Sequence, residues 1–180
     1  MSKKIKTQLL TALQGTDKDL QLKAIADAYD YGDAAIVKAL FELLKTTTDE
    51  EILDASFEFL FQVKDPLCAP VYAEYMLLTK GELRKEIIAA CWQSGMDFKN
   101  YIPHFVTMAI VTDFETAFEA ITVIENQEPP FDNAILTGSI AAIEKEVAKQ
   151  TNDKQALLQS LIVTLKNFKL SAFTAEFSEN

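Results

Sequence analysis

Residues that interrupt helices are scarce in this sequence of 180 residues, which contains only five glycines and five prolines. Because Gly and Pro disfavour helices most strongly, their scarcity predicts a helical chain. No apolar run approaches the roughly 20 residues that a helix needs to cross a bilayer. The residues after Lys3, Lys4 and Lys6 are too polar for the apolar core of a signal peptide. We therefore expect an all-α, cytoplasmic protein.

Residues that carry metal or nucleophilic chemistry are also few. Cys68 and Cys91 are the only cysteines, and both lie in apolar, helix-forming stretches that match no metal-ligand spacing. We interpret them as buried thiols. His104 is the only histidine, so nothing indicates a metal cluster or a Ser–His–acid site, and a structural or surface role is expected for it. The isolated glycines form no phosphate-binding loop, and we predict no catalytic residue, cofactor or metal ion.

Positive charge is scarce. The chain has 27 acidic and 17 basic residues, a net charge of −10, and a single arginine, Arg84. Nucleic acids and anionic membranes bind clustered Lys and Arg, so we expect neither as a partner. A protein with a basic segment is the partner that this charge favours.

The sequence does contain a Thr-x-x-acid motif that occurs four times. Its threonines are Thr16, Thr48, Thr79 and Thr112, which are 32, 31 and 33 residues apart. In a capping box the Thr hydroxyl accepts a hydrogen bond from the third helical residue, whose acidic side chain bonds back to the cap. We therefore predict that each threonine caps a helix and that one structural unit recurs at this spacing.

A second set of acids lies between these motifs. Asp33, Asp65 and Asp97 follow successive threonines by 17, 17 and 18 residues, and Pro66 stands directly after Asp65. Asp at an N-cap and Pro at the first helical position are both typical of helix starts. The unit is therefore a pair of helices, and the expected pairs are 3–14 with 17–31, 34–46 with 49–64, 66–79 with 81–95, 99–111 with 113–127, and 131–149 with 153–169.

We expect one domain over 1–170 and a C-terminal tail over 171–180. Phe173 and Phe177 in that tail either fold back on the last pair or belong to a frayed end.

Several stretches of the helix pairs share a pattern: the runs 33–44 and 97–106, Pro70, Pro103, and Leu83-Arg84 with Ile87-Ile88. With these residues, helix pairs of this length without Gly-rich turns resemble HEAT-like (armadillo-type) repeats, and the resemblance covers nearly the whole chain. A TPR array is disfavoured because its Trp, Gly, Tyr and Pro pattern does not occur. The resemblance to HEAT-like repeats implies an α-α superhelix of about five antiparallel helix pairs whose second helices line the concave side.

An acidic stripe follows the second helices. At about 100° per residue, the third, seventh, tenth and fourteenth positions after each Thr lie opposite a mainly apolar face that we expect to be buried. That apolar face includes Leu20, Phe57 and Leu83. The eight acids of the stripe are Asp19, Asp30, Glu51, Glu58, Glu82, Glu86, Glu115 and Glu119. Two explanations stay open: a solvated face that keeps the protein soluble, or a groove for a basic segment.

An aromatic ladder lies one position from this stripe. Its members are Tyr29, Phe61 and Trp92, the thirteenth residues after the first three threonines. Each lies four residues after an expected core position, which favours packing between neighbouring second helices over contact with a partner.

The sequence predicts a non-catalytic protein–protein interaction scaffold with an acidic concave groove for a basic protein segment. Small-ligand handling or lyase-like chemistry is the alternative, since some proteins with HEAT-like repeats resemble bilin lyases; it would need a deep pocket with convergent polar groups. A HEAT-like DNA glycosylase needs a basic concave face, which the acidic stripe contradicts.

Overall fold

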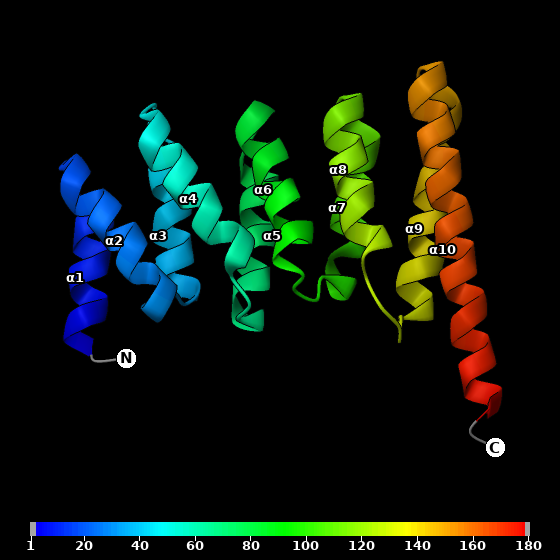
Figure 1. Cartoon of the computed structure of the whole chain (residues 1–180). Coiled ribbons are helices and arrows are strands. Elements are labelled where there is room, and N and C mark those ends of the chain that lie inside the picture. The colour runs from blue at the N-terminus through cyan, green and yellow to red at the C-terminus, as the bar shows by residue number, and fades with distance from the viewer. Residues whose placement is uncertain (1–2, 179–180) are drawn as a thin grey trace. The chain divides into compact units, whose positions relative to one another are not determined.

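The computed structural model of the protein describes the backbone of residues 3–178 and the side chains of 3–30 and 32–170. Within that range the chain is all-helical, with ten α-helices and no strand (Figure 1). The α-helices are α1 (Lys3–Leu13), α2 (Lys18–Tyr31), α3 (Ala34–Leu44), α4 (Glu50–Gln62), α5 (Ala69–Leu78), α6 (Gly81–Ser94), α7 (Ile102–Val111), α8 (Phe114–Glu125), α9 (Asn133–Glu146) and α10 (Asn152–Ser178). Three short 3₁₀ turns adjoin them: η1 (Pro66–Cys68), η2 (Lys99–Tyr101) and η3 (Val147–Lys149).

Each expected helix is present, and most helix ends lie within a few residues of the predicted ones. The exception is the C-terminus, because α10 continues to Ser178 through most of the expected tail. The side-chain packing of Phe173 and Phe177 lies outside the described residues. No helix of residues 3–178 combines the length and the apolar character that crossing a membrane requires.

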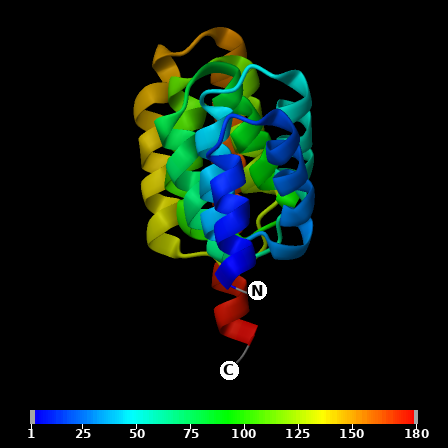
Figure 2. The ribbon, with the colours of Figure 1, turned by 90° about the vertical axis from the view of Figure 1, so that its left-hand side faces the viewer.

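The helices cluster into two compact units, Met1–Met96 and Asp97–Asn180, and each is described by itself. In unit 1, α1, α3 and α5 contact one another in succession, and α2, α4 and α6 do the same. Each helix of the first set also packs on the helix that follows it in sequence, as the α1–α2 pair nearest the viewer shows in Figure 2. In unit 2, α7 packs on α8 and α9, and α10 packs on α8 and α9. Each unit therefore has two helical layers. The single domain over 1–170 and the superhelix stay predictions.

Aromatic residues form the centre of unit 1. Phe41 is fully buried. Its ring packs edge-on against the Tyr72 ring, with centroids 5.1 Å apart, and stacks on the Tyr75 ring, with centroids 5.0 Å apart. The Tyr72 hydroxyl donates a hydrogen bond of 2.7 Å to the carbonyl oxygen of Leu60. These contacts join α3, α4 and α5 into one core, because they connect side chains and backbone of all three helices.

The two cysteines lie in the same unit, and the prediction that they are buried thiols is confirmed. Burial raises the pKa of the Cys68 thiol to about 11 and raises that of Cys91 well above its ordinary value. Both are therefore poor nucleophiles at neutral pH.

Two second helices approach each other closely where α2 ends. A Cβ atom added at Gly32 would lie 2.6 Å from Phe59 Cζ, so only glycine fits there without a shift of the Phe59 ring. Tyr29 meets Phe59 edge-on at 5.3 Å. This contact between α2 and α4 is the helix-to-helix packing expected for Tyr29. Phe61 stacks on Phe57 of its own helix.

The prediction that the four threonines are N-caps is wrong. The residue after the threonine caps α2, α4 and α8: Asp17, Asp49 and Asp113 accept hydrogen bonds from backbone N–H groups of the first helical turn. A carboxylate at this position accepts N–H bonds and carries the charge that the positive helix end favours. Helix α6 follows Lys80, whose side chain makes no capping bond.

Two of the threonines end the preceding helix instead. The Thr79 hydroxyl donates to the Tyr75 carbonyl at 2.7 Å, and the Thr112 hydroxyl donates to the Met108 carbonyl at 2.7 Å. Both therefore satisfy carbonyl oxygens at a helix C-terminus.

The caps expected at Asp33 and Asp65 are confirmed. Asp33 accepts from the backbone N–H groups of Ala35 and Ile36, and Asp65 accepts from that of Leu67, where η1 begins. Asp97 accepts from the Lys99 N–H at 2.9 Å, but the N-cap of η2 is the next residue, Phe98.

The capping role of Asp17 can be tested at the start of α2. We expect Asp17→Ala to lower the free energy of unfolding by about 1 kcal/mol, because the N–H of Leu20 loses its acceptor. Thr16→Ala is the matched control, and its effect should stay within about 0.5 kcal/mol because Thr16 is exposed. Urea denaturation followed by circular dichroism measures both; a larger loss for Thr16→Ala would restore the threonine as the cap.

Candidate binding groove between α4 and α6

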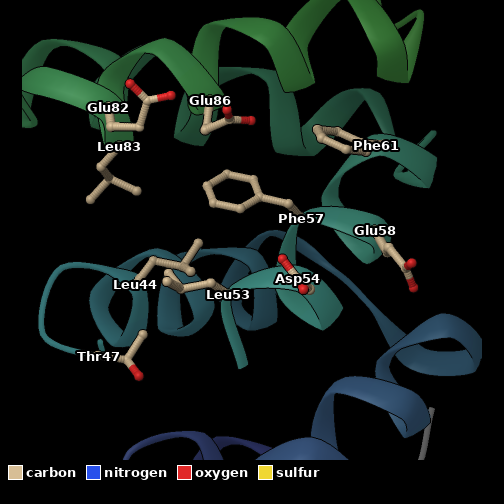
Figure 3. A pocket seen from close by; sticks show the side chains of 10 residues that line it. All are labelled: Leu44, Thr47, Leu53, Asp54, Phe57, Glu58, Phe61, Glu82, Leu83 and Glu86. Atoms are coloured by element: carbon tan, nitrogen blue, oxygen red, sulfur yellow. The ribbon is translucent and has the colours of Figure 1, made fainter. Parts of the chain in front are cut away.

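An apolar groove of about 580 Å³ lies between α4 and α6 in unit 1 (Figure 3). Leu53 and Phe57 of α4 and Leu83 of α6 are each half-buried, so part of every side chain stays open to solvent. In Figure 3 the Phe57 ring projects into the middle of the groove, between α6 and the end of α3. The full lining is Leu44, Thr47, Leu53, Asp54, Phe57, Glu58, Phe61, Glu82, Leu83 and Glu86.

The spacing of side chains on α4 builds this groove. Phe57 and Phe61 are one helical turn apart, and their rings stack with centroids 6.1 Å apart and an interplanar angle of 30°. Leu44, the last residue of α3, is buried and contributes to the lining. The expectation that Phe57 and Leu83 are core residues is therefore wrong in part: both face the core with one side and the groove with the other.

Carboxylates lie on both helices that form the groove. Asp54 and Glu58 are four residues apart on α4, and Glu82 and Glu86 are four residues apart on α6. Residues four apart share one face of a helix, so each pair follows its helix along the groove. Of the described residues that line the groove, none is basic. Lys85 lies outside it and contacts Glu82 at 2.8 Å, in a pair that leaves the Glu82 side chain 70% exposed.

A second, acidic hollow of about 810 Å³ continues from this groove, since Asp54 and Glu58 line both. It lies at the N-terminal part of α4, and its described lining is Lys18, Thr48, Asp49, Glu50, Glu51, Asp54, Ala55 and Glu58. Only one of these residues is a cation, and two carboxylates hold it.

That cation is Lys18, whose Nζ lies 2.8 Å from Glu51 Oε2 and 2.9 Å from Asp49 Oδ2. Its hydrogen bonds to Glu51 and Asp49 raise the pKa of Lys18. The hydrogen bond from Lys18 in turn holds the pKa of Asp49 below its ordinary value. The pair joins α2 to α4 and partly neutralises the hollow at this end.

The structure brings only some of the eight predicted acids together. Glu58, Glu82 and Glu86 line the groove, and Glu51 joins Glu58 in the acidic hollow. Asp19 and Asp30 are exposed on α2 and line neither feature, and Glu115 and Glu119 lie on α8 in unit 2.

The sequence prediction missed Asp54, although it stands one turn before Glu58 and belongs to the same helical face. It also placed Leu20 in the core, but Leu20 is 53% exposed because it lies in the first turn of α2, at the end of a layer in unit 1. Ala89, expected on the solvent side of α6, is buried.

His104, for which a structural or surface role is expected, lies on α7 in unit 2. It is half-buried, and its ring centroid lies 5.9 Å from that of Tyr101. Among the residues that the structure describes, no group of three or more His, Cys, Asp or Glu is arranged to hold a metal ion.

The chain matches no protein-family model, no curated protein and no solved structure. The resemblance to HEAT-like repeats therefore stays a prediction. The features of the chain that bear on function are the groove and the charges that surround it.

Proposed function

We propose that this chain is a non-catalytic, HEAT-like interaction scaffold whose acidic surface binds a basic segment of another protein. The observation that supports this proposal is the groove between α4 and α6, where four carboxylates accompany apolar side chains and no basic residue joins the lining. A surface of one charge attracts segments of the opposite charge and speeds their association.

The test removes charge without changing shape. We expect the triple variant Glu58→Gln, Glu82→Gln, Glu86→Gln to bind a fluorescein-labelled Lys/Arg/Ser peptide about tenfold more weakly than the natural protein at low salt. Three exposed or half-buried carboxylates that contribute about 0.5 kcal/mol each give a loss of that size. Fluorescence anisotropy measures the affinity.

A control variant separates this groove from the general negative charge of the chain. The triple variant Asp27→Asn, Glu74→Gln, Glu128→Gln changes the net charge by the same amount, at exposed sites outside the groove and the acidic hollow. Its affinity should stay close to that of the natural protein. Equal losses in both triple variants, or no binding of the peptide at low salt, would contradict the proposal.

A further inference from the structure

We infer that the groove between α4 and α6 binds an amphipathic helix of a partner protein, with a large apolar side chain seated against Phe57 and Leu83 and with Lys or Arg on both flanks. This inference rests on the proposed function and specifies the partner segment. It adds an apolar anchor and a helical conformation, neither of which a basic segment needs in order to be attracted by charge.

The apolar anchor follows from partial burial. Leu53, Phe57, Phe61 and Leu83 are half-buried, and all four line one groove rather than being scattered over the surface. A large apolar side chain placed there would remove the exposed parts of these residues from water. Aromatic and aliphatic anchors in such grooves dominate the affinity of helix-binding surfaces.

A helical conformation matches the spacing of the charges. Asp54 and Glu58 on one side, and Glu82 and Glu86 on the other, are each four residues apart, which is about 6 Å along a helix axis. A partner helix lying along the groove repeats its own side chains at i and i+4 with the same rise. Lys or Arg at such positions on both sides of an apolar stripe would therefore meet both carboxylate pairs.

Charge also argues for a different protein as the occupant. The chain carries a net charge of −10, and its N-terminal lysines lie on α1, which packs on α2 and α3 and buries Leu9 and Leu13. The apolar side of this basic helix is therefore used within its own unit. Binding of a second copy would place like charges together.

The test compares three synthetic peptides on the full chain. The first has Leu at helical spacing between Lys residues at i and i+4, the second replaces each Leu with Ser, and the third keeps Leu but has a central Pro that breaks the helix. We expect the first to bind more than tenfold tighter than either of the others, as measured by fluorescence anisotropy.

The double variant Phe57→Ala, Leu83→Ala tests the groove residues. In this variant the Leu peptide should no longer bind more tightly than the Ser peptide. The control is Leu78→Ala, Phe118→Ala, which truncates two apolar side chains that are 59% and 53% exposed outside the groove and should keep that advantage. Circular dichroism on each variant verifies that the helices are intact.

Other outcomes would overturn the inference in distinguishable ways. Equal binding of the Leu and Ser peptides, both weakened by the Glu→Gln triple variant, would leave the proposed function standing and remove the apolar anchor. Binding of neither peptide would end both proposals. If the Leu peptide keeps its advantage over the Ser peptide in Phe57→Ala, Leu83→Ala, the anchor lies elsewhere. If the Pro peptide binds as tightly as the Leu peptide, the bound segment is not a helix. If the natural protein forms a dimer that Phe57→Ala, Leu83→Ala abolishes, the occupant is a second copy of the chain.

Discussion

Replacing Phe41 with alanine is expected to lower the free energy of unfolding by about 3–5 kcal/mol. Phe41 is 0% exposed and contacts both Tyr72 and Tyr75, so truncation leaves a cavity between α3 and α5 in addition to the lost apolar transfer. Urea denaturation of the natural and variant proteins, followed by circular dichroism, measures the difference.

Phe57→Ala is the matched comparison for this prediction. The same atoms are removed, but Phe57 is half-buried at the groove and already has one side open to water. Its loss should therefore be clearly smaller, about 1–2 kcal/mol. Similar losses in the two variants would mean that the groove is closed in solution and offers no site for an apolar anchor.

The second large effect is expected at Lys154 of α10. Lys154 is only 7% exposed, and its Nζ donates to the carbonyl oxygen of Ile110 at 2.7 Å and to that of Thr112. Both carbonyls lie at the C-terminal end of α7, where a helix leaves its last acceptors without partners and favours a positive charge. Burial lowers the pKa of Lys154, and the negative charge of Asp113 opposes this effect.

Lys154→Ala should lower the free energy of unfolding by about 1–3 kcal/mol, because two carbonyl oxygens at the end of α7 lose their donor. Lys166→Ala is the control, since Lys166 is exposed and pairs with Glu144 at 3.2 Å, a contact that contributes about 0–1 kcal/mol. Thermal and urea denaturation separate the two outcomes. A loss for Lys154→Ala no larger than that for Lys166→Ala would show that water replaces the ammonium at little cost.

The positions of the helices were predictable because they depend on local sequence. Thr at regular spacing and Asp33 or Asp65 before apolar periodicity located the starts of the α-helices to within about three residues. The capping chemistry was not predictable from that pattern. Thr48-Asp49 and Thr112-Asp113 each offer two residue types that cap helices, and only the backbone geometry decides which one does so.

The groove was predictable only in its charges. Glu58, Glu82 and Glu86 followed from helical periodicity, whereas the exposure of Phe57 and Leu83 depends on how far α4 lies from α6. Contacts between residues far apart in the sequence could not be predicted either. The pairing of Lys18 with Asp49 and Glu51, and the bonds from Lys154 to the end of α7, join elements that the spacing of motifs does not relate.

Thr112 is the C-cap of α7, and the next residue, Asp113, is the N-cap of α8. One helix therefore stops and another starts on neighbouring residues, as they also do at Thr79 and Lys80. No residue separates the cap of one helix from the cap of the next, so the length of this junction is set by the two caps. The interval of 33 residues between these two threonines therefore holds α6, the link 95–98, η2 and α7. A residue added at either of the two direct junctions would have to lengthen a helix or displace the residue that caps it.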